Sequence, residues 1–181
     1  PRVEPYWYQM PINIFNATSA AEEWLYCWQE GKNWLREKEP DSIKVNCYGT
    51  DRFKELFGAI LRKQHPDQAA CNIGGVRAEE SPIRWVSLTQ DETYKGATWG
   101  KRHFDKSRYY AFYPIYDWSY TDVWKAIHDN GWLYCPLYDY MYQHGVPINR
   151  MRVSNVHHET AVKQLSFMQE VEPETWDRLS G

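Results

Sequence analysis

The chain lacks several patterns that mark common classes of protein. Its four cysteines contain no CxxC pair, which excludes zinc ribbons and thioredoxin-like redox motifs. No apolar run approaches the roughly 18 to 20 residues that cross a bilayer. The first ten residues also lack the basic start and apolar stretch of a signal peptide. We therefore expect a cytoplasmic protein that has no membrane partner and keeps its cysteines as buried, free thiols.

Neither sign of charge is in large excess, because 21 Lys and Arg residues stand against 24 Asp and Glu residues, for a net charge of -3. This balance argues against a generally basic surface that binds nucleic acid, but it leaves room for a local basic groove. The chain also lacks GxSxG, Walker A and HExxH motifs, which excludes the standard hydrolase and zincin classes. The adjacent His157 and His158 diverge on any regular backbone, so we expect no metal site or metal cluster.

Aromatic residues are abundant instead: 10 Trp, 14 Tyr and 6 Phe make up 17% of the 181 residues. We expect these side chains to form much of the core and many of its polar contacts. The length and the 43% of hydrophobic residues indicate a single globular domain over residues 1–181.

Local patterns predict strands that alternate with helices, which indicates an α/β fold with parallel strands. We expect extended segments at 6–15, 69–73 and 109–115, the second of them buried, and a loop at 89–108. Caps and apolar spacing predict helices at 19–28, 51–63, 136–144, 160–168 and 173–179, and two more that begin at Ser81 and Ser119.

The segment CNIGGVRAEESPIR combines a strand, a turn and a helix start, and it carries the clearest binding pattern. Ligands of α/β folds bind at the carboxyl ends of strands, where this segment has Gly74 and Gly75. The glycines allow close backbone approach, the helix start at Ser81 exposes amide donors, and Arg77 and Arg84 suit phosphate or sulfate. This pattern predicts an anion site.

Two features near the expected strand ends have structural alternatives. Glu79 and Glu80 can simply neutralise the arginines in a surface network, and local composition does not decide between this and an anion site. Asp117 and Trp118 follow the strand at 109–115, where a carboxylate suits ribose hydroxyls or a cation. They also directly precede a capped helix, which favours a structural turn.

A third feature is the basic segment 95–108, which contains five Lys or Arg residues and one Asp, a local excess of +4 in an acidic chain. A basic loop of this kind, with Lys101 and Arg102 near its middle, could close over a polyphosphate or a nucleic-acid backbone. The alternative is a solvated surface loop.

These segments resemble, in order, the motifs of the phosphoadenosine phosphosulfate (PAPS) reductase-like family. GGVRAEESPIR is similar to the family segment G-[VI]-R-x-[ED]-E-S-x-x-R, and YPIYDWSYTDVWKAI is similar to P-[IL]-x-D-W-x-x-x-D-[VI]-W. More narrowly, PYWYQMPINIFNATSAAEEWLYCW, PLYDYMYQHGV and EPETW resemble the branch that includes the immunoglobulin-binding regulator A, a co-activator of prophage gene expression.

The resemblance implies the adenine-nucleotide α-hydrolase fold, which is a Rossmann-like parallel sheet, here followed by a helical C-terminal region. The S-G-G-x-D-S pyrophosphate loop of that fold has no counterpart in this sequence. We therefore expect residues 1–181 to be the C-terminal portion of a longer family domain. We also expect exposed apolar sheet surface, or a sheet edge that a partner chain or the missing N-terminal segment covers.

By the same resemblance, Arg77 and Arg84 would face the phosphate or sulfate end of an adenine nucleotide such as ATP or PAPS. Glu80 and Ser81 would position the two arginines. Asp117 and Trp118 would mark the carboxyl edge of the next strand.

Two functions follow from this resemblance. The first is an enzyme of the sulfurtransferase or nucleotidyl-transfer type that acts on an adenine nucleotide, with these residues alone being inactive and the catalytic residues unknown. The second is a non-catalytic co-activator of prophage gene expression that acts through a protein partner or DNA. None of the four cysteines lies in the E-C-G-x-H context of the reductases, so we do not expect PAPS reduction through a thiol of this chain.

Overall fold

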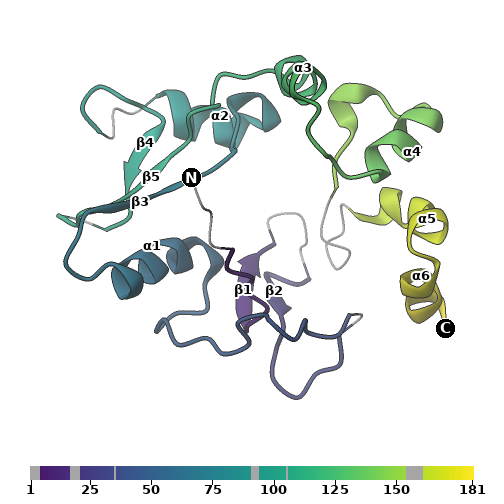
Figure 1. Cartoon of the computed structure of the whole chain (residues 1–181), viewed down its shortest axis with the longest axis horizontal. Helices are drawn as coiled ribbons and strands as arrows, with labels where there is room; N and C mark the ends of the chain where they lie inside the picture. Colours follow the sequence, from purple (N-terminus) through teal and green to yellow (C-terminus); the bar gives the residue numbers. More distant parts are fainter. Residues whose placement is uncertain (1–4, 17–20, 35, 91–93, 105, 154–160) are drawn as a thin grey trace. The chain divides into compact units, whose positions relative to one another are not determined.

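The computed structural model describes residues 5–16, 21–34, 36–90, 94–104, 106–153 and 161–181 (Figure 1). The chain forms two compact units: a first unit of residues 1–54 and 135–181, and a second unit of residues 55–134. In the described ranges, no helix combines the length and the hydropathy that a bilayer crossing needs. The organisation of residues 1–181 as one family domain stays a prediction.

The second unit is built around a three-stranded sheet with the order β3-β5-β4 (Figure 1). Strands β3 (Ala70–Ile73) and β5 (Tyr109–Phe112) are parallel neighbours, so both strand predictions and the α/β class are confirmed. Strand β4 (Gly100–Arg102) runs antiparallel to β5. The sheet is therefore mixed, and the expectation of parallel strands alone was wrong.

Strand β4 lies within 89–108, which we had predicted to be a loop. Three residues with two basic side chains show no apolar alternation, so only the pairing with β5 makes this segment a strand. Gly100 is required at the pairing position, because a Cβ there would lie 2.7 Å from the ring of Phe112. Lys101 and Arg102 consequently lie on a strand of the sheet and not on a flexible loop.

Strand β3 is more exposed than we predicted. Cys71 and Ile73 are exposed, the latter at 72%, because they lie on one face of a strand at the edge of the sheet. Apolar sheet surface is thus exposed, as we predicted. That a missing segment covers this surface stays a prediction.

The cysteines differ from the prediction for a related reason. Cys27 is buried, but Cys47, Cys71 and Cys135 are exposed, so the expectation of buried thiols was wrong for three of the four. Cys71 is exposed through its place on the open face of β3, whereas the expectation had treated the apolar run around it as core.

Helix α1 (Phe53–Gln64) confirms the predicted amphipathic helix, and Figure 1 shows it beside the sheet. It buries Leu56, Ala59 and Leu61. The helix comes close to the sheet at Gly58, where a Cβ would lie 2.8 Å from the Phe104 ring. The hydroxyl of Tyr109 on β5 also donates to the carbonyl oxygen that follows the helix, at His65, over 3.0 Å.

The two helices that follow the parallel strands begin at the predicted caps. In α2 (Pro82–Thr89), the hydroxyl of Ser81 accepts from the Arg84 N–H at 3.2 Å. In α3 (Tyr120–Asn130), Ser119 and the third helical residue form a full capping box. Helix α3 ends at Gly131, whose φ of 60° is the left-handed conformation that glycine adopts readily.

The first unit contains a two-stranded antiparallel sheet of β1 (Ile12–Phe15) and β2 (Trp24–Cys27). Strand β2 replaces the C-terminal half of the helix that we predicted at 19–28, while residues 17–20 lie outside the described ranges. The physical reason is cross-strand pairing: the ring of Phe15 packs edge-on against that of Trp24, with centroids 5.5 Å apart. A capping pattern carries no information on such a distant partner.

The C-terminal part of the first unit is helical, as predicted. It contains α4 (Leu137–Gln143), α5 (Val162–Val171) and α6 (Pro173–Ser180), and the short 3-10 turn η2 (Ile148–Arg150). A second 3-10 turn, η1 (Ala78–Glu80), belongs to the second unit. Arg36 forms an ion pair with Glu172, next to the start of α6.

Acid should weaken the packing of α1 through His103. This side chain lies against Gly58, with Nε2 2.5 Å from the Asn72 Oδ1 atom, and burial lowers the pKa of His103 below its usual 6.5. The neutral His103 side chain therefore contributes to the free energy of unfolding above about pH 6.5. This contribution is lost as the pH falls through the lowered pKa of the folded state. We expect the free energy of unfolding in urea to drop between pH 7.5 and pH 5.0, and to drop less in His103→Gln.

The control for this experiment is His65→Gln, because His65 is exposed. This variant should keep the full acid sensitivity of the wild type. An equal drop in His103→Gln and the wild type would show that another group causes the loss.

Candidate functional site

The segments that follow β3 and β5 meet at the carboxyl edge of the sheet. The Gly74 N–H donates to the Phe112 carbonyl oxygen at 2.9 Å, and the Ala78 N–H donates to that of Tyr116 at 2.8 Å. Arg77 Nη1 donates to the carbonyl oxygen of Trp118 at 3.3 Å. The structure therefore brings the residues predicted after the two strands to one edge, where ligands of α/β folds bind.

Only one of the two glycines is needed for this close approach. A Cβ at Gly74 would lie 2.9 Å from the ring of Tyr113, whereas one at Gly75 would find Ile115 at 3.7 Å, an ordinary contact. The requirement for glycine is thus strict at Gly74 only.

Tyr113 is a site residue that our sequence analysis missed. Burial raises the pKa of its hydroxyl, while the positive charge of Arg84 lowers it. The ring of Tyr113 lies beside the Gly74 turn. No signal in the sequence pointed to it, because we predicted the strand to continue to residue 115, whereas β5 ends at Phe112 and leaves Tyr113 directly after the strand.

The two arginines are paired with the two glutamates, as the structural alternative had it. Arg77 is 3.2 Å from Glu79 and 3.5 Å from Glu80, and Arg84 forms an ion pair with Glu80. The side chain of Arg77 is only 18% exposed, but that of Arg84 is 48% exposed. Arg84 is therefore the guanidinium that solvent, and any dissolved anion, reaches more readily.

Glu79 has a role that the sequence did not reveal. Its carboxylate accepts from the Tyr120 N–H at 2.6 Å, so it binds the first turn of α3 from 41 residues away. The same oxygen accepts from Arg77. Arg77 and Glu79 together join η1 to the start of α3, and no local pattern predicts a cap supplied from such a distance.

The start of α2 offers fewer amide donors than we expected. Pro82 has no N–H, and the N–H of Arg84 is taken by the Ser81 hydroxyl. The N–H of Ile83 is the remaining donor among the first three helical residues. Anion binding at this edge would thus depend mainly on the arginine side chains.

Asp117 and Trp118 lie in a turn, which agrees with the structural alternative. The Tyr116 N–H donates to the Tyr113 carbonyl oxygen at 3.0 Å, and the Trp118 N–H donates to that of Ile115 at 3.1 Å. Trp118 contributes its carbonyl oxygen to Arg77, while Asp117 is exposed at the same edge.

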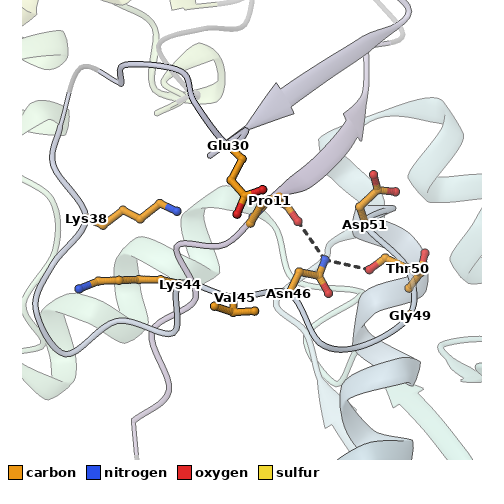
Figure 2. A pocket seen from close by; sticks show the side chains of 9 residues that line it. All are labelled: Pro11, Glu30, Lys38, Lys44, Val45, Asn46, Gly49, Thr50 and Asp51. Atoms are coloured by element: carbon orange, nitrogen blue, oxygen red, sulfur yellow. Dashed lines mark hydrogen bonds between the residues drawn. The ribbon is translucent and has the colours of Figure 1, made fainter.

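A separate cavity of about 490 Å³ lies in the first unit (Figure 2). Its charged lining residues are two lysines and two acids, namely Lys38, Lys44, Glu30 and Asp51. Figure 2 shows the two lysine side chains extending in opposite directions, so they do not converge on one point. The Asn46 amide nitrogen donates to the carbonyl oxygens of Pro11 and Thr50, both at 2.9 Å. The cavity contains none of the predicted site residues.

Within the described ranges, no group of three or more His, Cys, Asp or Glu side chains could hold a metal ion. The adjacent His157 and His158 lie outside those ranges.

The fold and the site define an α/β domain that gathers glycines, arginines and acidic residues at the carboxyl edge of two parallel strands. Residues 30–144, more than half of the chain, match the model of the phosphoadenosine phosphosulfate reductase domain, so the chain belongs to this family. The particular relative found is Uncharacterized protein YbdN of Escherichia coli (strain K12), which is 28% identical over 96% of this chain. The alignment covers 44% of YbdN, so the chain spans less than half the length of this relative. No solved structure matches the chain significantly.

Proposed function

We propose that the carboxyl edge of β3 and β5 binds an adenine nucleotide, such as ATP or PAPS, through its phosphate or sulfate groups. The family match supports adenine-nucleotide chemistry that involves sulfur or nucleotidyl groups. The observation that carries the proposal is the placement of Arg84, which is half exposed and forms an ion pair with Glu80. Glu80 also contacts Arg77, which donates to the Trp118 carbonyl oxygen at this edge.

The residues at this edge would have different roles. Arg84 would contact the anion, which has to join or displace the Glu80 carboxylate as its partner. Arg77 is held by the Trp118 carbonyl oxygen and by Glu79. It would orient the turn and add positive charge to the site without contacting the anion. Because these contacts already order the turn, nucleotide binding would cost less conformational entropy.

We propose group transfer as the reaction class, of the sulfurtransferase or nucleotidyl-transfer type, and not reduction by a thiol of this chain. Cys71 is the cysteine nearest to the site in sequence, but it lies on β3 ahead of the glycine turn. None of the four cysteines has the E-C-G-x-H context. The similarity to the branch of immunoglobulin-binding regulator A, and a co-activator role through DNA or a protein, stay predictions from sequence.

Calorimetric titration of the protein with ATP, PAPS and GTP tests the proposal. We expect ATP or PAPS to bind and GTP to bind at least tenfold more weakly, because adenine nucleotides are the ligands that the family match implies. Titration with inorganic sulfate shows how much of the affinity comes from the anion alone. Absence of measurable binding by both adenine nucleotides, or equal binding of GTP, would contradict the proposal.

A further inference from the structure

One face of the β4–β5 pair carries a set of aromatic side chains that the nucleotide proposal does not use. Along β5, Tyr109 and Ala111 are buried toward α1, so Tyr110 and Phe112 point to the opposite face. Arg102 of β4 is in register with Tyr110 and shares that face. Ile73, the β3 partner of Phe112, is 72% exposed. This face of the sheet is therefore open.

The aromatic face, as we name it, consists of the five rings of Tyr94, Trp99, Tyr110, Phe112 and Tyr116. The ring of Tyr94 is 4.8 Å from that of Tyr110 and 5.7 Å from that of Phe112. Trp99 links Phe112, at 5.8 Å, to Tyr116, on which it stacks at 6.0 Å with an interplanar angle of 11°. All five side chains are partly exposed, so each ring still presents surface to solvent.

Positive charges are interleaved with these rings. Lys95 Nζ lies 5.4 Å from the centre of the Tyr94 ring, and the Arg102 guanidinium lies 5.5 Å from that of Tyr110. Both residues are exposed. They belong to the basic segment 95–108, whose excess of +4 contrasts with the net charge of -3 of the whole chain.

We propose that the aromatic face binds single-stranded nucleic acid, with bases stacked on its rings and phosphates next to Lys95 and Arg102. Partly exposed rings next to cations are what such binding needs, because every base has a face that stacks and every nucleotide carries a phosphate. The charge complementarity favours a polyanion over an apolar protein segment. The inference goes beyond the proposed nucleotide site, since it uses neither Arg77 nor Arg84.

Fluorescence anisotropy with labelled 20-nucleotide single-stranded DNA and RNA of mixed sequence, and with a 20-base-pair DNA duplex, tests this proposal. We expect the single strands to bind more tightly than the duplex, with affinity falling between 50 and 200 mM salt. Arg102→Ala should weaken binding and lower the salt slope by about 0.7 for the lost phosphate contact. Tyr110→Leu and Phe112→Leu should each weaken single-strand binding by roughly tenfold, through lost stacking.

The matched control is Arg62→Ala. Arg62 also lies over an aromatic ring, that of Phe104 at 5.0 Å, but it belongs to α1. The Arg62→Ala variant changes the net charge by the same amount as Arg102→Ala and should leave oligonucleotide binding unchanged. Equal losses in the two variants would show unspecific charge attraction and overturn the proposal.

Absence of binding by both single strands at 50 mM salt would also overturn the proposal, as would a duplex that binds as tightly as they do. Arg102 is exposed, so Arg102→Ala decides the question even if the leucine variants fail to fold. Loss of ATP and PAPS binding in Arg84→Ala, with oligonucleotide binding retained, would show that the two sites are separate.

Discussion

The Arg84→Ala variant should bind ATP or PAPS ten- to a hundredfold more weakly than the wild type. A charge-assisted contact between a guanidinium and a phosphate or sulfate contributes about 1.5 to 3 kcal/mol, which corresponds to this range. The Arg84 side chain is 48% exposed, so the change removes the contact without opening a cavity in the core. Calorimetry with both nucleotides measures the effect directly.

Arg84 gives a cleaner test than Arg77. Replacement of Arg77 would remove its bonds to Trp118 and Glu79 as well as its charge, so a weaker affinity would have two explanations. Arg84→Lys keeps the charge but loses the planar fork, and it should recover only part of the affinity. Arg62→Ala controls for net charge. Unchanged nucleotide affinity in Arg84→Ala would remove this residue from the proposed site.

Local signals in the sequence predicted the elements that surround this site. Ser81 and Ser119 act as caps at the starts of α2 and α3, and α1 has the apolar face expected from its spacing. Each of these signals works within about four residues, so a single sequence is enough to recognise it. The convergence of the two strand ends followed from the parallel arrangement of β3 and β5.

Non-local contacts account for what the sequence did not predict. Strands β2 and β4 exist because of their partners β1 and β5, and β2 overrode a local helix pattern. The Glu79 cap on α3 spans 41 residues, and the exposure of Cys71 depends on which face of β3 is covered. The anion-site pattern pointed to the arginines, but their pairing with Glu79 and Glu80 depends on how the turn folds.

Gly58→Val should lower the free energy of unfolding of the protein by about 3 kcal/mol. Gly58 is buried in the middle of α1, and its Cβ would lie 2.8 Å from the Phe104 ring and 2.9 Å from the Cβ of His103. Both distances are too short for contacts between carbon atoms, so either α1 or the segment that contains His103 and Phe104 has to move. Overpacking of this kind typically costs about 1 to 3 kcal/mol. We expect the upper end of this range, because valine adds two methyl groups to a Cβ that is already too close to its neighbours.

Helix propensity does not explain such a loss, because glycine is itself less favourable than valine in a helix interior. Urea unfolding followed by circular dichroism at pH 7.5 measures the effect, with Lys54→Val as the control. Lys54 is an exposed position of the same helix, where valine should cost less than 1 kcal/mol. If Gly58→Val destabilises no more than Lys54→Val, then α1 does not pack on Phe104 and His103 through this glycine. The acid sensitivity assigned to His103 would then lose its structural basis as well.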